Sequence, residues 1–435
     1  MSAAERYVSS LRDGRQVWLD GRRVRDVTEQ VLLRKSVDWV VSGYERYDAA
    51  PNPAFVVPAS PVELRSQLEQ LLSGDRSLTS TAACVTALAT HDDSAFAERA
   101  RALVDEAKAD DLRMTPASVD TAKPVRVVAR RPDGIVVSGG KYHVLGAAVV
   151  HRLLVVPNGP VDEPEQAVAF TVPVNAPGVR IVVSTTAPRA VDDRHYPVSR
   201  RQSISEALVM LDDVFIPDEH VVLDGDTAGS GELASTLEEV ELAVAVAAQA
   251  DRSELVLGLA QSIAEMNGTG GVAHIQEKLA AIAVYAKMCR AGWEAALAGA
   301  RAGKGGAVRP DEAYLFAAKS YGTRSYSEMT YYLHDIAGGA VITAPTIADL
   351  DNPDIGEFCR KYMRTMENVS GEDRIRIFHA IRDLTADTFG GWDKVTNQAI
   401  GGNMQRQRMG ALHHSDLGAA KDRARREAGI SSNSS

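Results

Sequence analysis

A block rich in strand-forming residues, from Pro124 to Asp226, constrains the fold of this 435-residue chain more than any other feature. Val, Ile and Phe crowd the block, and Pro-Asp-Gly at 132–134 and Asn-Ala-Pro-Gly at 175–178 provide turns. The flanks instead carry Ala, Leu, Glu and Arg at helical spacing. We therefore expect an α+β protein with a helical domain over 1–123, a β domain over 124–226, and a C-terminal helical bundle with a tail over 227–435.

Local signals place individual elements in the two helical regions. Val17 and Leu19 alternate with their neighbours before the turn at Asp20-Gly21, which predicts a short hairpin. The pair Gly390-Gly391 predicts the end of a helix that begins near Asp373. A single apolar stripe predicts another long helix, with Ile275, Leu279, Ile282, Ala286 and Cys289 on one face.

Composition disfavours several classes of function. Hydrophobic residues make up 45% and charged residues 24% of the chain, as in an ordinary globular protein. A net charge of −10 disfavours broad nucleic-acid binding. No apolar run approaches the roughly 20 residues that span a bilayer, and the first residues lack the apolar core of a secretory signal. We therefore expect a cytoplasmic protein that binds neither nucleic acid nor membrane.

The three cysteines, Cys84, Cys289 and Cys359, are isolated from one another in the sequence. Zinc and iron–sulfur sites need closely spaced Cys or Cys/His ligands, and no such motif is present. We therefore expect no metal site, and reduced thiols inside a cytoplasmic protein.

The amino-acid sequences of the predicted strands narrow the choice of fold further. RPDGIVVSGGK at 131–141, AFTVPVNAPGV at 169–179 and LDDVFIPDEHV at 211–221 resemble the 4-hydroxyphenylacetate 3-hydroxylase family, the oxygenase half of two-component flavin monooxygenases. The resemblance implies an acyl-CoA-dehydrogenase-like fold, in which a central β-barrel domain and a C-terminal helical bundle form the cleft that holds flavin. It also implies a small-molecule substrate and reduced FAD supplied by a separate flavin reductase, since no Gly-x-Gly-x-x-Gly fingerprint follows a strand here.

The resemblance gives one strand a place beside the flavin ring. Val144, Leu145 and Gly146 match the family strand that passes along the isoalloxazine, and Leu145 replaces the usual threonine. Tyr142 and His143 lie close to that point, and strand alternation predicts that they point to opposite faces. Both are candidate catalytic residues, although His143 also fits a surface strand position.

Two further segments match cofactor-binding parts of the family. Gly338 and Gly339 correspond to a glycine pair beside the flavin phosphates or adenosine, although Gly-Gly after a helix is also a plain C-cap. Gln276 opens a long helix at which related flavoproteins contact cofactor from a neighbouring subunit. The Ala- and Leu-rich helices at 233–259 and 275–300 predict burial between subunits, and we expect a homotetramer.

The family's phenol-binding residues have no evident counterparts. Family members use an Arg and a Tyr from a "GRSPDY"-like segment and a His from a "THAxxNPQ"-like segment. The first segment is not recognisable here, and the second reads Thr115-Pro116-Ala117, with proline in place of the histidine. Arg113 lies beside that segment and is a third candidate catalytic residue, with His91 as a further substitute.

Three functions remain open at this point. The first is a divergent monooxygenase that uses reduced FAD and O2 on an aromatic or biosynthetic intermediate. The second is a non-oxidative enzyme on the same scaffold that catalyses an elimination, isomerisation or cyclisation. The third is a non-catalytic flavin- or ligand-binding protein. The retained strand and glycine motifs favour the first, whereas the missing phenol-binding set favours the other two.

Overall fold

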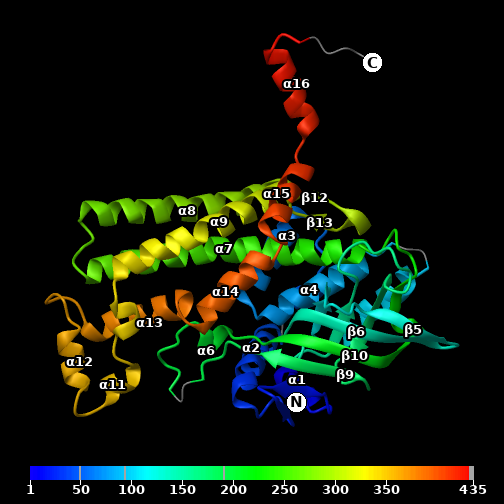
Figure 1. Cartoon of the computed structure of the whole chain (residues 1–435), viewed down its shortest axis with the longest axis horizontal. Coiled ribbons are helices and arrows are strands. Elements are labelled where there is room, and N and C mark those ends of the chain that lie inside the picture. Colours follow the sequence, from blue (N-terminus) through cyan, green and yellow to red (C-terminus); the bar gives the residue numbers. More distant parts are fainter. Residues whose placement is uncertain (49, 93–94, 190–191, 431–435) are drawn as a thin grey trace.

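Helices and strands alternate by region along the chain (Figure 1). The structure is a computed structural model that describes residues 1–48, 50–92, 95–189 and 192–430. The first region contains the elements α1 (Ala3–Ser10), β1 (Val17–Leu19), β2 (Arg22–Val24), α2 (Val31–Tyr47), η1 (Pro53–Phe55), α3 (Pro61–Ser73), α4 (Arg76–Ala89) and α5 (Ala97–Ala109). The expected hairpin is present as β1 and β2, with Asp20 and Gly21 at positive φ in its turn.

Most strands follow this helical region. They are β3 (Met114–Ala117), β4 (Val119–Asp120), β5 (Arg126–Arg131), β6 (Gly134–Leu145), β7 (Arg152–Val155), β8 (Val168–Pro173), β9 (Val179–Ser184), β10 (Glu206–Pro217) and β11 (Val221–Asp224), with the short helices α6 (Ser199–Gln202) and η2 (Asp218–His220). A 7-stranded sheet has the order β2-β1-β9-β10-β6-β4, with β5 also paired to β6. A 4-stranded sheet has the order β11-β8-β7-β3. Strands from before residue 124 therefore complete both sheets.

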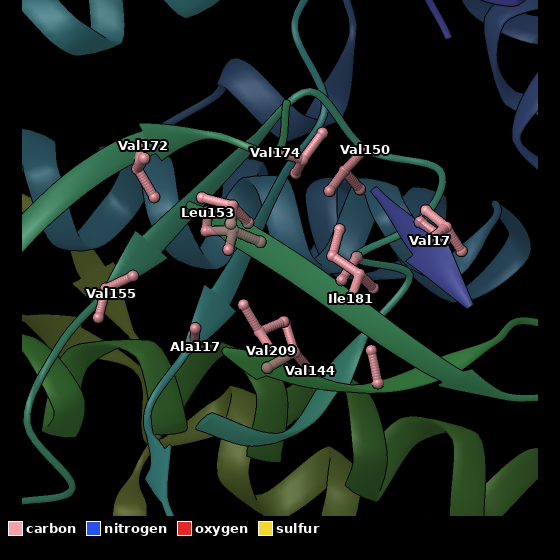
Figure 2. Close-up of a cluster of buried hydrophobic side chains, with 14 of the residues drawn as sticks. Val17, Ala117, Val144, Val150, Leu153, Val155, Val172, Val174, Ile181 and Val209 are labelled. Atoms are coloured by element: carbon pink, nitrogen blue, oxygen red, sulfur yellow. The ribbon is translucent and has the colours of Figure 1, made fainter. Parts of the chain in front are cut away.

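The two sheets share one hydrophobic core. Side chains from seven strands and the intervening turns point toward one another in Figure 2, and every one of them is buried: Val17, Ala117, Val144, Val150, Leu153, Val155, Val172, Val174, Ile181 and Val209. The alternation in the sequence predicts this packing, since each strand gives one face to the core. The expectation of a barrel is wrong, however, because the described strands between β1 and β11 form two open sheets.

The C-terminal region is a helical bundle. It comprises α7 (Glu232–Met266), α8 (Ala273–Ala298), α9 (Glu312–Ala337), α10 (Ala340–Thr343), α11 (Ile347–Asp351), α12 (Gly356–Tyr362), α13 (Gly371–Thr385), α14 (Thr388–Ala399), α15 (Met404–His413) and α16 (Leu417–Glu427), with η3 (Lys304–Gly306) and the small hairpin β12 (Arg301–Ala302) and β13 (Val308–Arg309) between α8 and α9. Helices α7, α8 and α9 run side by side, and α16 extends away from the body (Figure 1). No helix among the described residues is both long and apolar enough to cross a membrane.

The predicted helix stop at Gly390-Gly391 is wrong. The preceding helix α13 ends at Thr385, and both glycines lie inside the next helix, α14. A Cβ added at Gly390 would lie 2.6 Å from the carbonyl oxygen of Leu384. The glycine therefore permits a close approach of α14 to the end of α13, and this approach brings the following turn of α14 toward the β region.

Candidate active site

A cavity of about 1020 Å³ lies where the β region meets the helical bundle. This volume is at the upper end of the range of roughly 300–1,000 Å³ that is common for small-molecule and cofactor sites. Helices α4, α7, α14 and α15 and strands β3, β6 and β10 all contribute to its wall. Its charged and ionisable lining residues are Arg76, His143, Glu206, Glu232, Glu238, Glu241 and Arg406.

Strand β6 reaches the cavity through a bulge. His143 has a φ of 55°, and the pairing of β6 with β10 shifts register between Ala207 and Val209. Tyr142 and His143 are both exposed, although regular alternation would bury one of them. The expectation that these two side chains point to opposite faces is therefore wrong. Only His143 of the two lines the cavity, and Leu145 lines it farther along the strand.

Glu206, the first residue of β10, is held by groups from two elements. Trp392 on α14 donates its indole N–H to Oε1 of Glu206 at 2.7 Å, and the hydroxyl of Thr396 donates to the same oxygen at 3.2 Å. His143 Nδ1 lies 3.4 Å from Oε2. The Glu206 side chain is only 17% exposed, so these contacts fix a carboxylate in the cavity wall.

Helix α4 presents a cation and two hydroxyls to the cavity, from Arg76, Thr79 and Ser80. Asp75 starts this helix by accepting the N–H of Ser77 at 2.9 Å. Residues at i, i+3 and i+4 of a helix share one face, which explains why these three line the cavity together. The hydroxyl of Thr79 is buried and has no hydrogen-bond partner among the described residues.

Arg76 is not among the residues selected from the sequence, although a signal for it exists. Gly74-Asp75-Arg76-Ser77 keeps the glycine, arginine and serine of the sought "GRSPDY"-like segment, with one aspartate inserted. That aspartate is the N-cap of α4, so the insertion falls at the helix start and leaves Arg76 in the first turn. Ser80 then lies four residues after Arg76, where the family segment has tyrosine.

Helix α7 places two glutamates, Glu238 and Glu241, on the cavity wall one turn apart. The carboxylate of Glu238 forms an ion pair with Arg406 of α15. Burial raises the pKa of Glu241 to about 7, the charge of Arg76 lowers it in part, and the charge of Glu238 raises it. Burial likewise raises the pKa of Glu238, with Arg406 opposing the shift. An acid with a pKa near 7 can exchange a proton at neutral pH.

The other residues selected on β6 take structural positions. The side chain of Val144 is buried in the core between the sheets, as Figure 2 shows, and does not line the cavity. Gly146 has a φ of 69° and donates its N–H to the carbonyl of Ser205 at 2.7 Å, so it turns the chain at the end of β6. Tyr142 is 46% exposed and lies outside the cavity lining.

Arg113 lies in the protein core and not at the cavity. Its side chain is fully buried, with Nη2 3.9 Å from Oδ2 of Asp75. The guanidinium stacks over the ring of Tyr44 at 4.2 Å from the centroid. These contacts join α2, α4 and the start of β3, and we assign Arg113 no catalytic role.

Gly338 and Gly339 directly follow α9, and Gln276 lies in the first turn of α8. The end of α9 and the start of α8 lie at the opposite end of the bundle from β6 (Figure 1). Gly338 has a φ of 79° and donates its N–H to the carbonyl of His334 at 2.8 Å, which is the geometry of a helix C-cap. Gln276 is exposed and donates to the carbonyl of Gly270. None of the three lines the cavity of its own chain.

The relatives of this chain include monooxygenase components and a dehydratase/isomerase. The oxygenase component of 4-hydroxyphenylacetate 3-monooxygenase from Geobacillus sp. (strain PA-9) is 25% identical, over 88% of this chain and 87% of the relative. The 4-hydroxybutyryl-CoA dehydratase/vinylacetyl-CoA-Delta-isomerase from Clostridium aminobutyricum is 23% identical, over 99% of this chain and 100% of the relative.

Solved structures resemble the whole chain. The oxygenase component of 4-hydroxyphenylacetate 3-monooxygenase complexed with FAD superposes with a TM-score of 0.87 at 25% identity, covering 98% of each chain. Butyryl-CoA dehydrogenase from Megasphaera elsdenii superposes with a TM-score of 0.55 at 12% identity, over 95% of this chain and 98% of the other. The expected acyl-CoA-dehydrogenase-like fold is therefore confirmed.

Family models describe most of the chain. The model for the N-terminal part of 4-hydroxyphenylacetate 3-hydroxylase matches residues 59–223, and the model for the C-terminal part matches residues 234–429. The two matches follow one another in the order that the family requires, and they include every element that lines the cavity except the turn at 224–233. The chain belongs to the 4-hydroxyphenylacetate 3-hydroxylase family.

Proposed function

We propose that this protein is the oxygenase component of a two-component flavin monooxygenase in the cytoplasm. A separate reductase supplies reduced FAD, and the oxygenase inserts one oxygen atom from O2 into an aromatic or biosynthetic intermediate. The observation that carries the proposal is the cavity of about 1020 Å³ at the junction of β6, α4, α7 and α14 in a chain of this family. When bound, reduced flavin would supply the electrons that activate O2.

The residues around the cavity fit a flavin. The segment Val144–Gly146 ends β6 at the cavity edge, and Leu145 supplies an apolar surface for one side of a planar ring. Trp392 and Thr396 line the same cavity from α14, with an aromatic ring and a hydroxyl. We propose that the isoalloxazine lies between β6 and α14, where the enclosed surface limits access of water.

A second copy of the chain completes the cofactor site in this proposal. Gly338, Gly339 and Gln276 are exposed at the far end of the bundle, so they are free to contact flavin held mainly by another chain. A Cβ at Gly339 would meet nothing within 4 Å in its own chain. We therefore propose that the chain assembles as a homotetramer in which this turn lies beside the phosphates or adenosine of a neighbour's FAD.

The substrate would lie between the flavin and helices α4 and α7. Arg76 provides a cation and Ser80 a hydroxyl, while Pro116 leaves no imidazole at the third position of the family's phenol-binding set. His143, beside Glu206, is the remaining imidazole at the cavity. We propose His143 as the candidate catalytic acid or base, because the other candidates, Tyr142 and Arg113, lie outside the cavity lining.

A non-oxidative elimination or isomerisation is the second candidate function. The match to the Clostridium aminobutyricum dehydratase over 99% of this chain favours it. The cysteines of the described chain lie on separate helices, with Cys84 on α4, Cys289 on α8 and Cys359 on α12, and none lines the cavity.

Measurements of flavin binding and oxygen consumption distinguish the monooxygenase from the non-oxidative enzyme. Purified protein should be titrated anaerobically with FAD reduced by dithionite, and separately with oxidised FAD, and each dissociation constant measured by fluorescence. The monooxygenase proposal expects tighter binding of reduced than of oxidised FAD, and oxygen consumption in the presence of a flavin reductase and NADH. Absence of binding to either form would exclude it.

A further inference from the structure

We infer that the substrate of this enzyme carries a cationic amine that is received by Glu241 on α7. This inference rests on the proposed function, because it places the amine-bearing substrate in the flavin cavity. It goes further in that it names a charge for the substrate.

The cavity contains more acidic than basic side chains. Four glutamates line it, Glu206, Glu232, Glu238 and Glu241, against two arginines, Arg76 and Arg406, and one histidine. Glu238 and Arg406 pair with each other. Glu206 is held by Trp392, Thr396 and His143. Among the charged cavity-lining groups of the described chain, Glu241 and Arg76 are left with no ion pair or hydrogen bond from another side chain.

Glu241 and Arg76 interact across a gap and not through contact. Each shifts the pKa of the other group, yet no ion pair joins them within 4.0 Å in this part of the described chain. Arg76 is also compensated by Asp393 of α14, the charge that acts on it most strongly. The carboxylate of Glu241 is thus the less compensated of the two, and a ligand between α4 and α7 would meet an open acceptor.

The hydroxyl of Thr79 is a second polar group in this cavity wall that a ligand would satisfy. Thr79 lines the same cavity from α4, its side chain is buried, and Oγ1 has no partner among the described residues. A buried hydroxyl without a partner loses free energy that a bound donor would restore. An ammonium group carries three donors, enough for the carboxylate, this hydroxyl and one further acceptor.

The charges around Glu241 favour a cation over a neutral donor. The charges that act on Glu241 are Arg76 from α4 and Glu238 from its own helix. Arg406 from α15 and Glu206 from β10 line the same cavity, and Cys84 of α4 is buried nearby. Burial and the charge of Glu238 raise the pKa of Glu241 to about 7, which records the cost of its negative charge among these groups. A cationic nitrogen would relieve that cost directly, whereas a neutral hydroxyl would do so only by one hydrogen bond.

Three ligands with the same phenol ring test the inference. Tyramine carries a cation, 4-ethylphenol is neutral, and 4-hydroxyphenylacetate carries an anion. Isothermal titration of the full chain at pH 8 should give the affinity order tyramine, then 4-ethylphenol, then 4-hydroxyphenylacetate. Equal affinities, a preference for the acid, or no heat of binding with millimolar tyramine would overturn the inference.

A charge-neutral variant tests whether Glu241 is the group that receives the amine. Glu241→Gln should weaken tyramine by about tenfold or more, since charge-assisted hydrogen bonds are lost, and should leave 4-ethylphenol within about twofold. Glu219→Gln is the matched control, because Glu219 is exposed on η2 and lies outside the cavity lining. The control should bind all three ligands as the natural protein does. Unchanged tyramine affinity in Glu241→Gln would overturn the assignment.

The pH dependence gives a second readout. Alkylamines stay protonated well above pH 8, so tyramine affinity should rise from pH 6 to pH 8 as Glu241 ionises, and this rise should be absent in Glu241→Gln. Hydroxylation with reductase and reduced FAD is assayed separately. Tyramine preference without hydroxylation would contradict the proposed function alone, and hydroxylation of 4-hydroxyphenylacetate as fast as of tyramine would contradict this inference alone.

Discussion

Trp392 on α14 donates its indole N–H to the carboxylate of Glu206 on β10, with 2.7 Å between Nε1 and Oε1. This bond links the helical bundle to the 7-stranded sheet at the wall of the cavity. Gly390 and Gly391, just before the tryptophan, belong to the first turn of the same helix, and the close packing at Gly390 positions that turn. The cavity therefore depends on a contact between two regions that are far apart in the sequence.

Removing this indole N–H should weaken the fold moderately. Trp392→Phe keeps an aromatic ring and leaves Glu206 with the 3.2 Å bond from Thr396. We expect the free energy of unfolding to fall by about 1–2 kcal/mol, the usual effect of losing one partner of a mostly buried hydrogen bond. Urea denaturation measures this free energy. The control variant Tyr331→Phe, on the exposed face of α9, should change the free energy of unfolding by less than about 0.5 kcal/mol. An unchanged midpoint for Trp392→Phe would mean that the bond adds no net stability.

Adding one methyl group at Gly43 of α2 should destabilise the protein. A Cβ there would lie 2.0 Å from Oδ2 of Asp75 and 3.4 Å from Nη2 of Arg113, both fully buried. Overpacking of this kind costs about 1–3 kcal/mol, so Gly43→Ala should lower the thermal midpoint. Gly258→Ala on α7 is the matched control, because nothing lies within 4 Å of that position.

The control should behave in the opposite way. Alanine is favoured over glycine inside a helix by up to about 1 kcal/mol, so Gly258→Ala should raise the midpoint or leave it unchanged. The same midpoint for both variants, measured by differential scanning calorimetry, would show that α2 can move away from Asp75.

Acid should destabilise the protein through His151. The backbone N–H of Arg113 donates to Nδ1 of His151 at 2.8 Å. Nε2 of His151 lies 2.9 Å from the Ser10 hydroxyl, and that hydroxyl donates to the carbonyl of Tyr7 at 2.7 Å. His151 is therefore neutral with its proton on Nε2. Burial, with the charges of Arg15 and Arg113, lowers its pKa to about 3.

The sign of the pH effect follows from that lowered pKa. Between about pH 6.5 and pH 3 the unfolded chain takes up a proton at His151 that the folded chain does not, so stability falls as pH falls in that window. One such group contributes about 1.4 kcal/mol per pH unit. The free energy of unfolding can be measured by urea denaturation at several pH values from 5.0 to 6.5. Its slope against pH should be shallower in His151→Gln than in the natural protein, by the amount that corresponds to about one proton. The exposed variant His413→Gln serves as control and should keep the full slope.

Leucine at Gly339 should reduce FAD affinity without unfolding the chain. Gly339 has open space around its Cβ position and no positive φ, so a side chain fits its own subunit. If this turn contacts a neighbour's cofactor, Gly339→Leu should weaken binding of reduced FAD by at least about tenfold while circular dichroism stays the same. Unaltered affinity would place the cofactor away from this turn.

Light scattering tests the assembly on which that result depends. Leu255 on α7 and Val284 and Met288 on α8 are exposed apolar residues on adjacent helices of the isolated chain. Burial of this surface between subunits predicts a tetramer at micromolar concentration. A monomer under these conditions would contradict both the assembly and the shared cofactor site.

Periodicity in the sequence was sufficient to predict the order of regions and most long elements. The stripe from Ile275 to Cys289 lies inside α8, and every one of its five members is buried. Periodicity could not predict that the strands stay in two open sheets, because pairing between strands distant in sequence decides closure. Nor could it distinguish a glycine that ends a helix from Gly390, whose role depends on contact with Leu384.

The candidate site was only partly accessible from the sequence. His143 and Leu145, selected from the sequence as catalytic and cofactor-binding candidates, both line the large cavity, while their roles toward flavin stay predictions. Arg76 was missed because one inserted residue, the N-cap Asp75, interrupts the sought segment. Glu241 was missed because a glutamate in an Ala- and Leu-rich helix carries no sign of its surroundings until α4 is packed against it.

The bulge in β6 makes the cavity wall sensitive to a change in chain length. Lys141 and Val144 are both buried although they are three positions apart, because Tyr142 and His143 together occupy the exposed side. Deleting either residue would restore regular pairing with β10 while Lys141 and Val144 kept their buried positions, and it would remove the extra residue on the exposed side. A single-codon deletion here would thus change the backbone shape of β6 at the cavity edge, which no single substitution does.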